Sequence, residues 1–166
     1  MNGSKFKVLL YSDESQSAFF AVVYSAILLM NMPNMHLTVV QLKESNDGSI
    51  GNENNWMNSW PISLISDWVK DVIFSKRIVD VSHQLIYCNP SIPDTVDALL
   101  EYTTKNSIEL IVMGTEAKTT LKRLVLGRLG HSLQIKSPIP VLLVKSLPQD
   151  FLNSYSPKMT LKVIRK

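Results

Sequence analysis

The chain has 166 residues, of which 45% are hydrophobic and 19% charged, and its net charge is +3. This length suits one domain. The positive charge is small and scattered, so it does not indicate a nucleic-acid or anionic-membrane partner. The single cysteine, Cys88, excludes an internal disulfide framework and fits a reducing compartment. No apolar run is long enough to span a bilayer, so we expect a cytoplasmic protein.

The first half of the chain alternates apolar runs with a helical segment. Phe6–Tyr11 and residues 37–42 are typical of short buried strands, and residues 18–30 between them suit a buried helix. Residues 44–59 are rich in Asn, Ser and Gly, which predicts a mobile surface loop. Trp56 and Trp60 either anchor the end of this loop, which we favour, or pack down as a lid.

The second half repeats the alternation. A helix is predicted over about residues 64–80, a strand over 82–88, and a helix after Ser91, whose spacing to Asp94 resembles a capping box. Further strands are predicted at residues 108–114 and at Val141–Val144, with an amphipathic helix from Gly127 to about residue 136. Repeated strand–helix alternation predicts a doubly wound α/β fold with a parallel sheet.

The stretch from residue 108 to 144 resembles the universal stress protein family. That family carries Gly-x2-Gly-x9-Gly-Ser/Thr after its fourth strand and a last strand of the Pro-Val-Leu-Val-Val type. Here the four positions are Gly114, Ala117, Gly127 and Arg128, followed by Pro-Val-Leu-Leu-Val at 140–144. The first and third glycines match, whereas the second glycine and the Ser/Thr are replaced.

The resemblance extends over about residues 5–144 and implies an architecture. It implies a five-stranded parallel sheet in the order 3-2-1-4-5, similar to the adenine nucleotide alpha hydrolase fold. We expect one domain over residues 1–148, containing the loop at about 44–60. Residues 149–166 are then a C-terminal extension, in which 159–164 alternate like an extra strand.

The resemblance also implies an adenine-nucleotide crevice between the first and fourth strands. The residues before the first helix resemble the family's Val-Asp-Gly-Ser, so that Asp13 matches the family's aspartate. Val39 and Val40 stand where a valine lines the adenine pocket, and Met113 and Gly114 would line the sugar. Asp13 is explained equally well as the N-cap of the first helix.

The phosphate side of the implied crevice is altered. Gly127 is expected just before a helix whose free N–H groups would face the ligand. Ala117 adds a methyl group where positive φ is needed. Arg128 replaces a small hydroxyl donor, and either pairs with an anion or fills the anion's place. We therefore expect weak or absent binding of ATP or AMP, with Mg²⁺ present only as the companion of ATP.

No catalytic residue can be assigned from the sequence. His36, His83 and His131 are isolated and lack metal-site spacing, and no set of nucleophile, base and orienting group can be assembled. The sequence thus predicts a regulatory or stress-tolerance module with a degenerate nucleotide crevice, not an enzyme. The alternatives are an ATP- or AMP-binding switch with slow ATP hydrolysis, and a structural dimer without a ligand. In each case we expect a homodimer through Val141–Val144 at a sheet edge.

Overall fold

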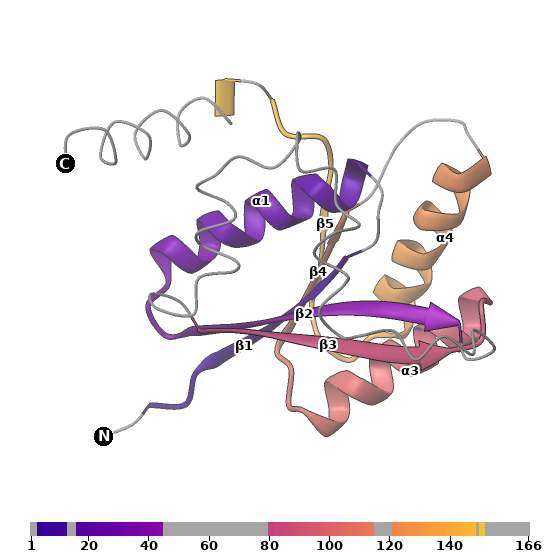
Figure 1. Cartoon of the computed structure of the whole chain (residues 1–166), viewed down its shortest axis with the longest axis horizontal. Coiled ribbons are helices and arrows are strands. Elements are labelled where there is room, and N and C mark those ends of the chain that lie inside the picture. The colour runs from indigo at the N-terminus through magenta and orange to yellow at the C-terminus, as the bar shows by residue number, and fades with distance from the viewer. Residues whose placement is uncertain (1–2, 13–15, 45–79, 115–120, 149, 152–166) are drawn as a thin grey trace.

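The computed structural model describes residues 3–12, 16–44, 80–114, 121–148 and 150–151. Five parallel strands form one sheet in the order β3-β2-β1-β4-β5, which confirms the predicted fold class and strand order (Figure 1). The elements in chain order are β1 (Phe6–Tyr11), α1 (Gln16–Asn31), β2 (Met35–Glu44), β3 (Asp80–Cys88), α3 (Ile92–Lys105), β4 (Leu110–Gly114), α4 (Leu121–Lys136) and β5 (Val141–Val144).

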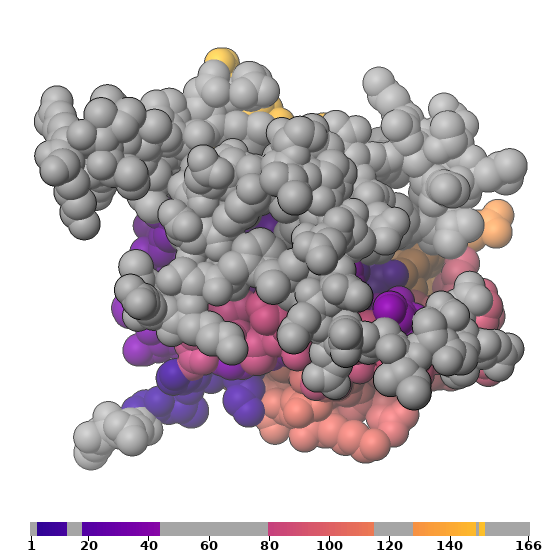
Figure 2. Space-filling view, viewed as in Figure 1, coloured from indigo at the N-terminus to yellow at the C-terminus, as the bar shows by residue number. Residues whose placement is uncertain are grey.

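Two apolar clusters bury the two faces of the sheet. One contains the buried side chains of α1, and the other contains those of α3 and α4. The central strand β1 shows why its sequence is apolar without interruption: Leu9 and Leu10 point to opposite faces, and both are 0% exposed. Part of β3 is visible at the surface of the face in Figure 2, as its edge position requires.

Two helix boundaries differ from the sequence prediction. Asp80, expected at the end of a helix, is the first residue of β3, and the rest of that predicted helix lies outside the described residues. α4 begins at Leu121, so the prediction that a helix begins just after Gly127 is wrong. The residues before Gly127 are mostly good helix formers, and one glycine inside a helix costs only about 1 kcal/mol.

A glycine allows α4 to approach the sheet closely. A Cβ atom added at Gly130 would lie 3.1 Å from Cδ2 of Leu143 on β5 and 3.8 Å from the sulfur of Met113 on β4. The helix therefore covers the carboxyl-terminal half of both strands at short range. None of the helices in the described ranges combines the length and the apolarity needed to cross a bilayer.

The described part of the C-terminal extension contacts α1. The ring of Phe151 stacks on that of Tyr24, with 6.4 Å between centroids and 19° between ring planes. Leu147 also packs against the apolar cluster on that face. The predicted loop at 44–60 and the predicted strand at 159–164 lie outside the described residues, apart from residue 44, which ends β2.

Candidate functional site

The order of the sheet reverses between β1 and β4. From β1 the chain adds β2 and β3 on one side, and then β4 and β5 on the other. Leu10 of β1 pairs with Val112 of β4, so two residues further along bring Ser12 level with Gly114. In open parallel sheets, ligands bind beyond the carboxyl ends of the strands at such a reversal. Ser12 and Gly114 are therefore at the place where a ligand is expected.

Ser12 buries a hydroxyl group that has no partner among the residues that the structure describes. Its side chain and backbone are 1% exposed, and its N–H donates to the carbonyl of Val40 at 3.0 Å. Its Oγ makes no hydrogen bond within the described residues. A buried polar group without a partner costs about 1–3 kcal/mol. Ser12 was not predicted as a site residue, because a sequence pattern shows that a serine follows a strand but not that its hydroxyl is buried.

The residues predicted around the adenine and sugar separate into two groups. Val40 and Met113 are both 0% exposed and belong to the same apolar cluster, beneath α3 and α4. Gly114 is buried at the end of β4. Val39 belongs to the cluster on the α1 face, so it does not share a wall with Val40. Asp13 lies outside the described residues.

The residues predicted around the phosphates do not form a helix N-terminus. Gly127 and Arg128 are the seventh and eighth residues of α4, well inside the helix. Inside a helix each N–H donates to the carbonyl four residues earlier, so these two N–H groups are not free donors for an anion. Arg128 is exposed on the helix surface. Ala117 lies outside the described residues.

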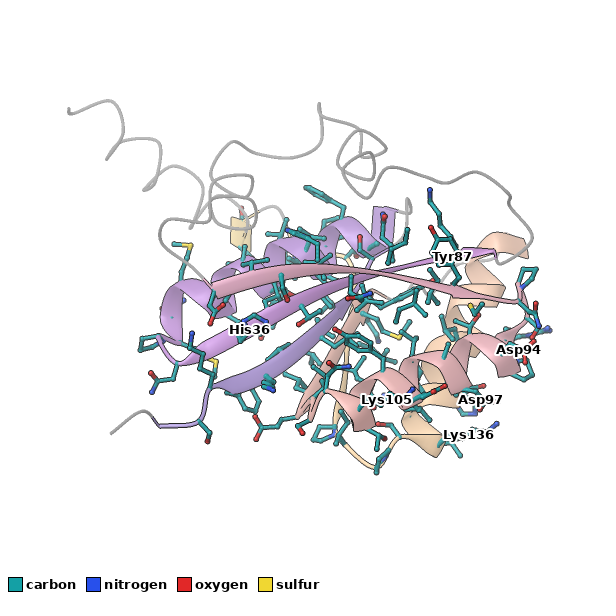
Figure 3. The ribbon with its side chains drawn as sticks, turned by 60° about the horizontal axis from the view of Figure 1, so that its bottom comes forward. His36, Tyr87, Asp94, Asp97, Lys105 and Lys136 are labelled. Atoms are coloured by element: carbon teal, nitrogen blue, oxygen red, sulfur yellow. The ribbon has the colours of Figure 1, made fainter. Side chains whose placement is uncertain are left out.

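A second set of polar side chains lies near the amino ends of β2 and β3. We call it the His36 cluster, and it consists of His36, Thr38, Asp80, Ser82 and Lys5. His36 Nδ1 lies 2.7 Å from Asp80 Oδ1, and His36 Nε2 lies 3.0 Å from Ser82 Oγ. Thr38 Oγ1 lies 3.2 Å from Ser82 Oγ. Figure 3 shows His36 far from Tyr87, which marks the other end of the sheet.

Parallel register explains this cluster. His36 is paired with Asp80, and Thr38 with Ser82, so all four side chains point to the α3 face. The predicted isolated histidine is therefore part of a network, and the missing partners were 44 and 46 residues away in sequence. The sequence does contain a His-x-Thr pattern in one strand and an Asp-x-Ser pattern in the neighbouring strand. The register between the two strands, which brings these side chains together, could not be predicted from the sequence.

Electrostatics hold Asp80 in its charged form. Lys5 Nζ donates a hydrogen bond to Asp80 Oδ2, and this bond, with the contribution of His36, holds the pKa of the Asp80 carboxyl below its usual value against the opposing effect of desolvation. Burial raises the pKa of the Tyr102 phenol, although a hydrogen bond with Thr38 opposes this. Within the described ranges, no three His, Cys, Asp or Glu side chains are grouped to hold a metal ion.

Comparison with known proteins gives matches to one family. Residues 92–145 match the model of the universal stress protein family. Over 52 residues the chain is 36% identical to the stress response protein NhaX of Bacillus subtilis, and this match spans 31% of each chain.

Solved structures match most of the chain. A universal stress protein in complex with cAMP has a TM-score of 0.57 and 20% identity, covering 86% of this chain and 98% of its own. A family protein from Burkholderia pseudomallei has a TM-score of 0.56 and 18% identity, covering 85% and 96%. One from Archaeoglobus fulgidus has a TM-score of 0.60 and 18% identity, covering 87% and 45%. At these identities the likeness shows a common fold.

Proposed function

Since the chain belongs to the universal stress protein family through residues 92–145, we propose that it is a stress-response regulatory module with a degenerate adenine-nucleotide crevice. In this proposal the crevice takes the nucleoside part of an adenine nucleotide weakly and has lost most of its hold on the phosphates. Its action is proposed to be cytoplasmic, which the reducing compartment indicated by Cys88 supports.

The observation that carries the proposal is the buried hydroxyl of Ser12. It lies at the reversal of strand order, level with the backbone of Gly114, and has no partner within the described residues. A ligand hydroxyl or ring nitrogen in the crevice would supply the missing hydrogen bond. The complex of one structural relative with cAMP supports an adenine nucleotide as the class of ligand.

The position of α4 supports the loss of the phosphate side. Because the helix runs through Gly127, the backbone there has no free N–H group for phosphate. The side chain of Arg128 is exposed on the surface of the helix. One lost hydrogen bond to a charged group is worth about 1.5–3 kcal/mol, or roughly tenfold to a hundredfold in affinity. ATP should therefore bind no more tightly than adenosine.

Isothermal titration calorimetry with adenosine, AMP and ATP tests this proposal. We expect weak binding of adenosine and no gain from added phosphates. The double variant Ala117→Gly/Arg128→Ser should tighten ATP binding about tenfold and leave adenosine unchanged, because it restores only phosphate contacts. Ser12→Ala should weaken all three ligands equally, since it removes a contact to the nucleoside.

Other outcomes would favour the alternatives. If the natural protein binds ATP far more tightly than adenosine and Arg128→Ser weakens it, Arg128 is a phosphate ligand and the crevice is a working nucleotide switch. If none of the three ligands binds at millimolar concentration, the structural dimer without a ligand is favoured and the proposal is wrong.

A further inference from the structure

We propose that the His36 cluster is a second, hydrolytic site, in which Ser82 is a nucleophile toward small activated acyl esters and His36 is its general base. The site lies at the amino ends of β2 and β3, whereas the nucleotide crevice lies at the carboxyl ends of β1 and β4. The inference is therefore independent of the proposed function.

The three central side chains have the connectivity of a nucleophilic triad. Asp80 Oδ1 lies 2.7 Å from Nδ1 of His36, and Ser82 Oγ lies 3.0 Å from the opposite ring nitrogen, Nε2. With Asp80 charged, Nδ1 carries a proton and its N–H donates a hydrogen bond to the carboxylate. Nε2 is then left to accept the hydroxyl proton of Ser82. This arrangement of nucleophile, base and orienting carboxylate is recognised by geometry and not by sequence order.

Thr38 completes the orientation of Ser82. The hydroxyl of Ser82 has one proton, and the triad directs it to His36. In the proposed arrangement the contact of 3.2 Å between Thr38 Oγ1 and Ser82 Oγ is a hydrogen bond donated by Thr38. Thr38 is 4% exposed, so it is fixed by its surroundings. It therefore helps to fix the position of the nucleophilic oxygen.

The cluster is partly exposed. The side chains of His36 and Asp80 are 23% and 37% exposed, and Ser82 is half-buried. Of the strands in the described ranges, β3 is the last on its side of the sheet. Lys5, 57% exposed, is bound to the second carboxylate oxygen of Asp80 and leaves the oxygen that orients His36 free for that task.

The reaction is an ordinary acyl transfer to water. Ser82 Oγ bonds to the carbonyl carbon of the ester while its proton passes to Nε2 of His36. The bond from that carbon to the leaving oxygen then breaks, and the leaving group takes the proton from His36. Water, losing a proton to His36, attacks the acyl-serine, releases the carboxylic acid and returns the proton to Ser82.

Labelling with a fluorophosphonate probe, with the adduct located by mass spectrometry, tests the proposal on the folded full-length protein. We expect one adduct, on Ser82. We also expect hydrolysis of p-nitrophenyl acetate that requires the same side chains as the labelling. His36→Gln should slow both by about a hundredfold, because a general base contributes 10²–10⁴ in rate. Ser82→Ala should abolish both.

Two controls separate chemistry from structure. Ser91, an exposed serine whose Oγ accepts from the N–H of Asp94, has no histidine partner in the described part of the chain and should stay unlabelled. Asp80→Asn should slow labelling of Ser82 strongly, as expected for a positioning residue. Lys105→Met removes an exposed ion pair with Glu101 that lies outside the cluster, so it should leave the rate unchanged.

Either of two results overturns the proposal. One is a natural, folded protein that gives no adduct on Ser82, or labels Ser82 and Ser91 equally. The other is His36→Gln protein, shown by thermal unfolding to be folded, that labels at the natural rate. The first result is obtained with the natural protein alone. The proposal can therefore be refuted even if a variant does not fold.

Discussion

Replacing Leu133 with alanine should lower the free energy of unfolding by about 2–5 kcal/mol. Leu133 lies on α4, is 0% exposed, and belongs to the apolar cluster between α3, α4 and the sheet. Its truncation removes buried apolar surface and leaves a cavity that the short-range packing of α4 at Gly130 prevents from collapsing. Urea denaturation at one fixed protein concentration measures the change.

The matched control is Ile135→Ala, two residues further along the same helix. Ile135 is 70% exposed, so its loss should change the free energy of unfolding by no more than about 0.5 kcal/mol. Equal effects of the two substitutions would contradict the packing of α4 described above. A large effect of Leu133→Ala alone would support it.

The second large effect is expected at β5, through which we propose that the protein dimerises. Among the described strands, β5 is the last on its side of the sheet. The N–H of Ile111 donates to the carbonyl of Pro140 at 3.0 Å, and Ile111 is paired with Val141. In a parallel ladder the N–H of Val141 must then point away from β4, toward the outer edge. An outward edge of this kind can pair with the same edge of a second copy.

Val141→Pro should therefore weaken the dimer and leave the sheet intact. Proline lacks the N–H group that points outward at this position, and no hydrogen bond to β4 is lost. Because both protomers of a two-fold dimer carry the substitution, two intermolecular hydrogen bonds are lost, at about 0.5–1.5 kcal/mol each. We expect the dimer dissociation constant in sedimentation equilibrium to rise about tenfold to a hundredfold. Ser146→Pro, just beyond the strand, should change nothing. A natural protein that is monomeric at micromolar concentration, or a variant that dimerises normally, would contradict the proposal.

The fold was largely predictable because its strands are short apolar runs. The strands at Phe6–Tyr11 and Val141–Val144 have the predicted bounds, and the other strands begin or end within two residues of them. The start of α4 was not predicted, because Gly127 was taken as the end of a loop. Six helix-compatible residues before it outweigh the small cost of one internal glycine.

Only the part of the candidate site that depends on the end of a single strand could be predicted from the sequence. Gly114 ends β4 at the reversal of strand order, as the pattern indicated. The buried state of Ser12 depends on how three strands pack, which no local pattern contains. The His36 cluster depends on register between β2 and β3, whose members are separated by more than 40 residues. A shift by one residue would turn these side chains to the other face.

A crystal structure of the protein soaked with AMP tests whether the carboxyl ends of β1 and β4 bind an adenine nucleoside. We expect density for the nucleoside between the carboxyl ends of β1 and β4, with a polar atom within hydrogen-bond distance of Ser12 Oγ, and weak density for the phosphate. An empty crevice at saturating AMP, with Ser12 Oγ bonded to the protein's own chain, would contradict it.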